Sequence, residues 1–180
     1  VTYVAGARFV GTNLDYLFSY CTSLVSVKLP GNSSAAVSLC FTFYYCTSLE
    51  RVNSDTDGEF DLTAFSAGIS DLNYAFQQCL KVVSIKLPEY SATAVSLKEA
   101  FRDCYSLERV NSDIVGEFDL TGFSAGISNL NYTFSYCLKA ISIKLPGYSA
   151  AVNLGYAFRS CNSLQSIEGL EDFTNVSNLN

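Results

Sequence analysis

One pattern recurs along this chain: Leu, then Phe four residues later and Cys three residues after the Phe. LNYAFQQC, which begins at Leu72, is one copy. Complete copies begin at Leu14, Leu39, Leu72, Leu97, Leu130 and Leu154, and a seventh begins at Leu179 and is cut off. Repeats of about 20–50 residues indicate a solenoid, because one repeat cannot bury its apolar side without its neighbours. Residues 1–180 are therefore predicted to form one domain of stacked coils.

The coils have two lengths. Residues 39–71 and 97–129 form long coils of 33 residues, and shorter coils of 24 or 25 residues separate them. Pro30, Pro88 and Pro146 recur every 58 residues, so we interpret a short coil followed by a long coil as the evolutionary unit. Because the sequence starts within this pattern and stops within a new copy, we expect it to be an excerpt of a longer chain.

Each copy of the pattern predicts a short amphipathic helix. In the copy at Leu72, small or apolar residues stand at Leu72, Ala75, Phe76 and Cys79, which is the spacing of one helical face. Phe is expected to fill the centre of the coil and Cys to pack as a small apolar residue. Helical turns in successive coils should stand too far apart for disulfides. We therefore expect free thiols, with Cys40, which lies outside the register, as the exposed and reactive one.

A strand is predicted after each Cys. Apolar residues stand three and six positions beyond it, as in Leu24 and Val27, and a Pro ends the run in the short coils. Stacked strands would form a parallel sheet. The predicted fold is an α/β repeat solenoid with this sheet on one side and short helices or turns on the other.

The motifs CTSLVSVKLP, from Cys21, and AFQQC, from Ala75, resemble those of the BspA-like leucine-rich repeat family. The closing LEDFTNVSNLN resembles a related repeat of bacterial surface proteins. This resemblance covers residues 14–180. It implies a right-handed leucine-rich solenoid that is displayed outside the cell, takes part in adhesion or partner binding, and has no catalytic residues.

Composition excludes several classes of function. The net charge is −6 and no basic patch is present, which argues against nucleic-acid binding. No apolar run approaches the roughly 18 residues of a membrane helix, so no membrane insertion is expected in this segment. The chain has no His, which excludes Ser–His and Cys–His catalysis. We expect neither an enzyme nor a cofactor.

The long coils contain similar inserts, NSDTDGEFDLTAFSAGIS from Asn53 and NSDIVGEFDLTGFSAGIS from Asn111. The first resembles a calcium loop, but Ala64 replaces the closing Glu and the second copy has Val115 in place of Asp57. We therefore expect no metal site. A hairpin-like excursion that turns at Gly58 is predicted instead, with its Phe and Leu side chains folded back onto the solenoid.

Outward positions around the predicted strands define an outer ladder, and solenoids often bind partners on such faces. Inert surface is the alternative interpretation. The outer ladder consists of Val25, Lys28, Glu50, Arg51, Val83, Lys86, Glu108, Arg109, Ile141 and Lys144.

A second set of outward residues is aromatic and lies two or six residues after the starting Leu. Mutual packing between coils is one interpretation, and a partner interface is the other, because Tyr suits interfaces with one wet edge. This tyrosine stripe consists of Tyr16, Tyr20, Tyr45, Tyr74, Tyr132, Tyr136 and Tyr156.

The sequence thus predicts a non-catalytic, extracellular interaction or adhesion module at the cell surface, with a protein or glycan ligand. The alternative is a structural subunit or spacer of a surface filament, appendage or viral fibre that associates end to end. Asn32, Asn131 and Asn175 stand in glycosylation motifs, which are informative only in an organism that glycosylates.

Overall fold

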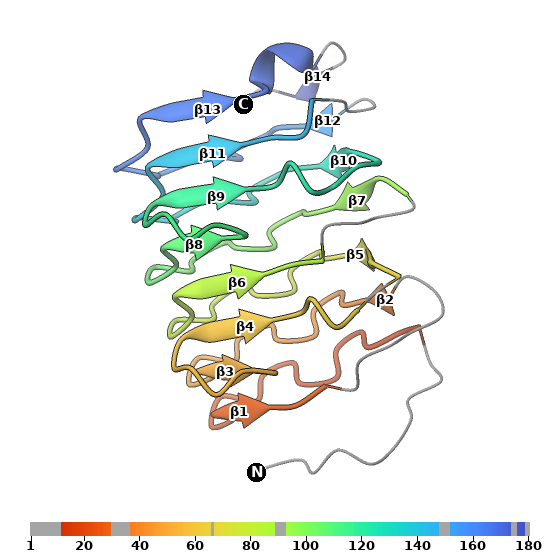
Figure 1. Cartoon of the computed structure of the whole chain (residues 1–180), viewed down its shortest axis with the longest axis vertical. Coiled ribbons are helices and arrows are strands. Elements are labelled where there is room, and N and C mark those ends of the chain that lie inside the picture. Colours follow the sequence, from red (N-terminus) through yellow and green to blue (C-terminus); the bar gives the residue numbers. More distant parts are fainter. Residues whose placement is uncertain are drawn as a thin grey trace.

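The computed structural model describes residues 12–29, 37–65, 67–88, 93–147, 152–173 and 176–178. The chain winds into a parallel-strand β-solenoid whose short strands form two columns (Figure 1). Pro30, Asn32, Asn175 and Leu179 lie outside the described residues.

The larger sheet has eight strands in the order β1-β3-β4-β6-β8-β9-β11-β13, and every pairing in it is parallel. This sheet confirms the strand predicted after each Cys. Its strands are β1 (Ser26–Val27), β3 (Arg51–Val52), β4 (Glu59–Asp61), β6 (Ser84–Lys86), β8 (Arg109–Val110), β9 (Glu117–Asp119), β11 (Ser142–Lys144) and β13 (Ser166–Glu168).

The smaller sheet lies where each coil leads into the next starting Leu. Its order is β14-β12-β10-β7-β5-β2, again with parallel pairing. Its strands are β2 (Val37–Ser38), β5 (Ile69–Asp71), β7 (Val95–Ser96), β10 (Ile127–Asn129), β12 (Val152–Asn153) and β14 (Val176–Asn178). A short 3₁₀ helix, η1 (Leu170–Asp172), stands near the end of the solenoid.

The predicted α-helices are wrong: the described residues contain no α-helix, and each repeated pattern folds as two successive tight turns. In the copy at Leu72, the Ala75 N–H donates to the Leu72 carbonyl and the Cys79 N–H to the Phe76 carbonyl, both at 3.0 Å. Tyr74, with φ of 59°, occupies the left-handed region that an α-helix excludes. The residues two and six after the starting Leu have a positive φ in all six copies.

Spacing between coils explains why turns replace helices. The Tyr74 N–H donates to the Lys98 carbonyl at 2.8 Å and the Phe76 N–H to the Ala100 carbonyl at 3.0 Å, so the turn segment bonds to the next coil as a strand does. Sheet strands lie about 4.8 Å apart, whereas packed helices need about 8–10 Å. Two sheets with one or more strands per coil leave no room for a helix in every coil.

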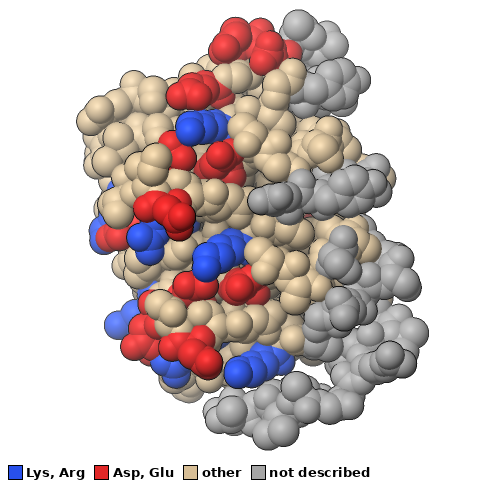
Figure 2. All heavy atoms as spheres, in the orientation of Figure 1, with Lys and Arg blue, Asp and Glu red and all other residues tan. Residues whose placement is uncertain are grey.

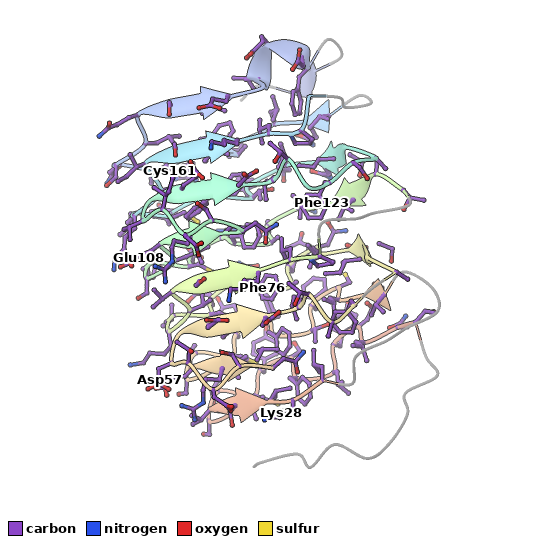
Figure 3. The ribbon with its side chains drawn as sticks, in the orientation of Figure 1. Lys28, Asp57, Phe76, Glu108, Phe123 and Cys161 are labelled. Carbon is purple, nitrogen blue, oxygen red and sulfur yellow. The ribbon has the colours of Figure 1, made fainter. Side chains whose placement is uncertain are left out.

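The predicted burial is nevertheless confirmed. Leu72, Ala75, Phe76 and Cys79 are completely buried, because the first and last residues of each turn face the core. The Phe rings stack along the axis, and Phe76 lies between the two columns of strands (Figure 3), with ring centroids 6.0 Å from Phe43 and 5.8 Å from Phe101.

The cysteines form a ladder of thiols rather than disulfides, and all seven are free. Five of them donate the S–H to the Phe carbonyl of a preceding coil, as Cys104 does to Phe76 at 3.1 Å and Cys137 to Phe101 at 3.2 Å. Free thiols were predicted, but the reason was wrong: successive coils are close, since backbone hydrogen bonds join them along this segment.

Cys40 is not the exposed thiol. It is half-buried, and burial together with the negative charges of Asp71 and Asp15 raises the pKa of Cys40 to about 11. Cys21, in the first described coil, is the exposed cysteine.

Each insert adds a strand to the larger sheet instead of a hairpin. Val52 in β3 pairs with Phe60 in β4, and the pairing is parallel. Gly58 turns the chain with φ of 79°, and its N–H donates to the Glu50 carbonyl at 2.8 Å. Phe60, Leu62 and Phe65 are buried, as predicted. The two inserts explain why one sheet has two strands more than the other.

Candidate functional site: the outer face of the eight-stranded sheet

Strand register brings the outer ladder onto one continuous face. Ser26 pairs with Arg51 and Ser84 with Arg109, so the first outward residue of each strand forms one row. A second row stands two residues further along each strand. It consists of Lys28, Asn53, Asp61, Lys86, Asn111, Asp119, Lys144 and Glu168. Lys and Arg alternate with Asp and Glu along this face (Figure 2).

A third row stands just before the strands and contains Val25, Glu50, Val83, Glu108 and Ile141. The Glu108 N–H donates to the Val83 carbonyl at 2.8 Å, which joins neighbouring members of the row. Gly116 stands between Glu108 and Ile141, and its N–H donates to the Glu108 carbonyl at 2.8 Å. Val25 and Ile141 expose 41% and 38% of their surface, so aliphatic side chains stand beside the charged rows.

The inserts supply carboxylates that pair with the ladder cations. Lys86 Nζ lies 2.8 Å from Glu59, and Lys144 Nζ lies 2.8 Å from Glu117. Hydrogen bonds from Lys144 and Ser112 lower the pKa of Glu117. The sequence analysis missed these acidic partners, because only the strand register shows which residue faces which.

Three further pairs tie ladder residues to nearby segments. Arg51 pairs with Asp57 and Lys28 with Asp55, and both carboxylates belong to the first insert. Figure 3 labels Lys28 and Asp57. Glu108 pairs with Lys139 at 2.6 Å. Exposed ion pairs contribute only about 0–1 kcal/mol each. Their main effect is to hold the charged groups of the face in defined positions.

The tyrosine stripe lies on the turn segments and packs along the axis. Tyr16 stacks on Phe41 with centroids 4.8 Å apart, and Phe41 stacks on Tyr74 at 4.2 Å. Tyr132 stacks on Tyr156 at 4.7 Å. Tyr20 stacks on Tyr45 with ring centroids 5.3 Å apart, and the centre of the Tyr136 ring lies 5.9 Å from Arg159 Cζ. Much of the stripe therefore serves coil-to-coil packing, although Tyr16 and Tyr20 remain mainly exposed.

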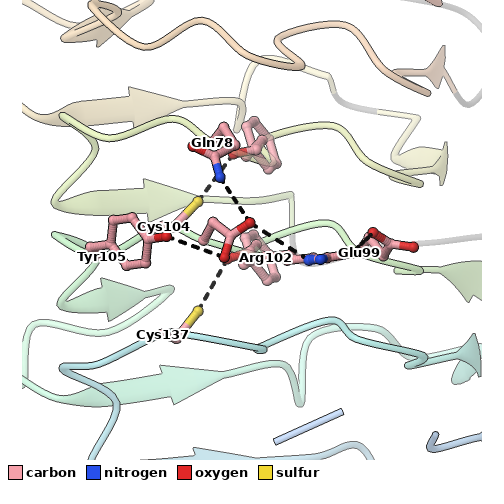
Figure 4. A network of polar contacts seen from close by, with 9 residues as sticks. Gln78, Glu99, Arg102, Cys104, Tyr105 and Cys137 are labelled. Carbon is pink, nitrogen blue, oxygen red and sulfur yellow. Dashed lines mark hydrogen bonds and ion pairs between the residues drawn. The ribbon is translucent and has the colours of Figure 1, made fainter. Parts of the chain in front are cut away.

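A charged network interrupts this stripe in the coil that begins at Leu97. Glu99 and Asp103 occupy its two left-handed positions, and Arg102 pairs with both, at 2.7 and 3.6 Å (Figure 4). Gln78 also donates to Asp103, at 2.8 Å. The Arg102 guanidinium lies 5.1 Å from the centre of the Tyr132 ring, so cation–π contact replaces ring stacking here. The sequence analysis missed this network, although two acids at tyrosine positions could have indicated it.

The acidic side chains of the inserts make local hydrogen bonds within the chain. Within the described ranges no group of three His, Cys, Asp or Glu side chains is placed to hold a metal ion. Asp61 accepts hydrogen bonds from the backbone and hydroxyl of Thr63, and Asp119 does the same for Thr121. These carboxylates therefore serve the local turn.

Asn131 is half-buried, and its Nδ2 donates to the Gly155 carbonyl at 2.9 Å. A glycan on this nitrogen would have to disrupt the contact with the next coil. In the part of the chain that the structure describes, no helix has the length and apolar character to cross a membrane.

Comparisons with known proteins agree with the repeat. The model of the BspA type leucine-rich repeat region matches residues 10–73 and 70–179, in six copies. A solved leucine-rich repeat protein of T. pallidum is 23% identical, with a TM-score of 0.45 over 82% of this chain and 70% of that chain. No curated protein matches the sequence. Because the family model covers nearly the whole chain, this protein belongs to the BspA-type leucine-rich repeat family.

Proposed function

We propose that this chain is a non-catalytic protein-interaction module that binds its partner through the outer face of the eight-stranded sheet and acts in adhesion at the cell surface. Its family is one of interaction repeats, and leucine-rich repeat solenoids are typically binding scaffolds rather than enzymes. Proteins of this family are usually secreted or displayed on bacterial surfaces, which supports the extracellular setting.

One observation carries the choice of face. The outer face of the sheet is continuous across eight strands, several ladder cations on it pair with carboxylates of the inserts, and exposed aliphatic side chains stand among them. Groups that are already held in place lose less conformational entropy on binding, which favours affinity. The face formed by the turns is less suited to partner binding, because most side chains of the tyrosine stripe already stack on one another or on neighbouring side chains.

The proposal can be tested with an array of surface and matrix proteins and glycans. We expect the purified chain to bind at least one protein on the array. Val83→Ser and Lys86→Glu, which change the centre of the outer ladder, should abolish that binding. Lys81→Ala is the matched control, because Lys81 is exposed but outside the ladder. Binding that survives both ladder changes would contradict the choice of face.

The same preparation tests the alternative of a filament subunit. A binding module should remain dispersed in light scattering, whereas a subunit should form assemblies that lengthen with protein concentration. Long particles in electron microscopy, without any partner on the array, would favour the structural role.

A further inference from the structure

The loops that open the two inserts make the same backbone hydrogen bonds but differ in two exposed side chains. The Gly58 N–H donates to the Glu50 carbonyl, and the Gly116 N–H to the Glu108 carbonyl, both at 2.8 Å. The loops between read NSDTDG and NSDIVG, so Ile114 replaces Thr56 and Val115 replaces Asp57. Each insert is therefore an internal control for the other.

This replacement leaves one arginine without its carboxylate. Arg51 pairs with Asp57, whereas Arg109, at the same position of the next unit, faces a loop with Val115. Among the described residues, Arg109 has no ion-pair partner. Two acids close to it in the sequence pair with lysines instead: Glu108 with Lys139, and Glu117 with Lys144.

Exposed aliphatic side chains stand on the segments next to this arginine. Ile114 and Val115 expose 62% and 58% of their surface, and Ile141 exposes 38%. The Ile141 N–H donates to the Gly116 carbonyl at 2.8 Å, which places Ile141 beside the loop. Its side chain covers Gly116 so closely that a Cβ there would lie 2.5 Å from Ile141 Cδ1. Contiguous exposed apolar side chains commonly mark interaction sites.

We propose that Arg109, Ile114, Val115 and Ile141, the Arg109 patch, dock a partner polypeptide segment that presents a carboxylate next to an aliphatic or aromatic side chain. The partner carboxylate takes the place that Asp57 occupies beside Arg51, and the neighbouring apolar side chain covers the three aliphatic residues. A guanidinium is suited to this role, because it binds carboxylates with two parallel hydrogen bonds. This inference rests on the proposed function and adds the chemistry of the partner.

A phage-displayed library of random linear dodecapeptides provides the probe. Selection on the whole chain should enrich peptides with Asp or Glu beside Leu, Ile, Val or Phe, and one synthetic selected peptide is then titrated by calorimetry. Val115→Asp should weaken its binding at least about tenfold, because it supplies the carboxylate from within the chain. Arg109→Ala should have a similar effect. Lys81→Ala, which changes an exposed cation outside the outer ladder, is the control and should leave the affinity unchanged.

A gain of function gives the sharper test. The double change Thr56→Ile and Asp57→Val converts the loop NSDTDG of the first insert to the loop NSDIVG of the second. The selected peptide should then bind with a stoichiometry of two instead of one. Both changes are at exposed loop positions, so the fold should be retained, and circular dichroism checks this.

The outcomes separate this inference from the proposed function. Failure to enrich acidic peptides, or peptide binding that Val115→Asp and Arg109→Ala leave intact, would overturn the Arg109 patch while partner binding on the array could stand. Conversely, peptide binding at the patch combined with an array partner that ignores the outer ladder would overturn only the proposed face.

Discussion

At the turn positions with a positive φ, a Gly variant should be more stable than an Ala variant. In a helix the order would be the opposite. Gln78 lies in an interior coil with φ of 63°, and its side chain donates to Asp103. Gln78→Gly and Gln78→Ala lose the same hydrogen bond, so the difference between the two variants reports on the backbone alone.

The magnitude follows from two opposing terms. A left-handed conformation costs an L-residue about 1–2 kcal/mol, which Gly avoids. Gly loses about 0.5–1 kcal/mol more than Ala in conformational entropy on folding. Gln78→Gly should therefore be more stable than Gln78→Ala by about 0.5–1 kcal/mol. In a helix, Gly would instead be less stable than Ala by about 0.8–1 kcal/mol.

Urea unfolding, monitored by circular dichroism, measures this difference. If the free energy of unfolding falls with urea concentration at the same slope in both variants, only stability has changed. If the Gly variant were the less stable of the two, the result would contradict the pair of turns and favour a helix in this segment. Glu99 offers an independent site, since it also has a positive φ of 53°.

Three other predictions concern the core, the thiols and the inserts. Phe76→Ala should lower the free energy of unfolding by about 3–5 kcal/mol, because Phe76 is buried between rings on both sides. Phe158→Ala should lower it less, since that ring is only partly buried. Equal losses in denaturant unfolding would contradict the stacked core. A thiol reagent should label Cys21 first in the native protein and all seven cysteines after denaturation. Cys40 should label slowly at neutral pH, because its pKa is raised to about 11. Rapid labelling of Cys40 would contradict its half-buried position beside Asp71 and Asp15. Chelator should leave the melting temperature unchanged, because Asp57 already pairs with Arg51, and a shift of several degrees on adding calcium would reveal a site that we reject.

Periodicity predicted what is buried, whatever the backbone does. Phe76 and Cys79 recur at fixed distances from a starting Leu, and a residue type repeated in every coil without variation indicates a shared core position. The same argument placed Phe60 and Leu62 of the insert in the core. These inferences needed only residue chemistry and spacing.

The spacing of the apolar residues was not enough to predict the backbone conformation of the repeated pattern. The positions of Leu72, Ala75, Phe76 and Cys79 fit one face of a helix and also the ends of two successive turns, so the pattern alone cannot separate the two. Tyr74 and Gln78 gave no warning either, since neither is a residue that favours a positive φ.

Composition and period were enough to predict the solenoid and its core residues. Whether the coils carry turns or helices depends on the stacked coils together, because the two flanking sheets set a spacing of about 4.8 Å per strand. The tertiary structure also decided the ion pairs of the outer ladder. Which carboxylate meets Arg51 or Lys86 depends on strand register between segments 6 to 27 residues apart. The same register is needed to see that Arg109 has no carboxylate partner within the described part of the chain.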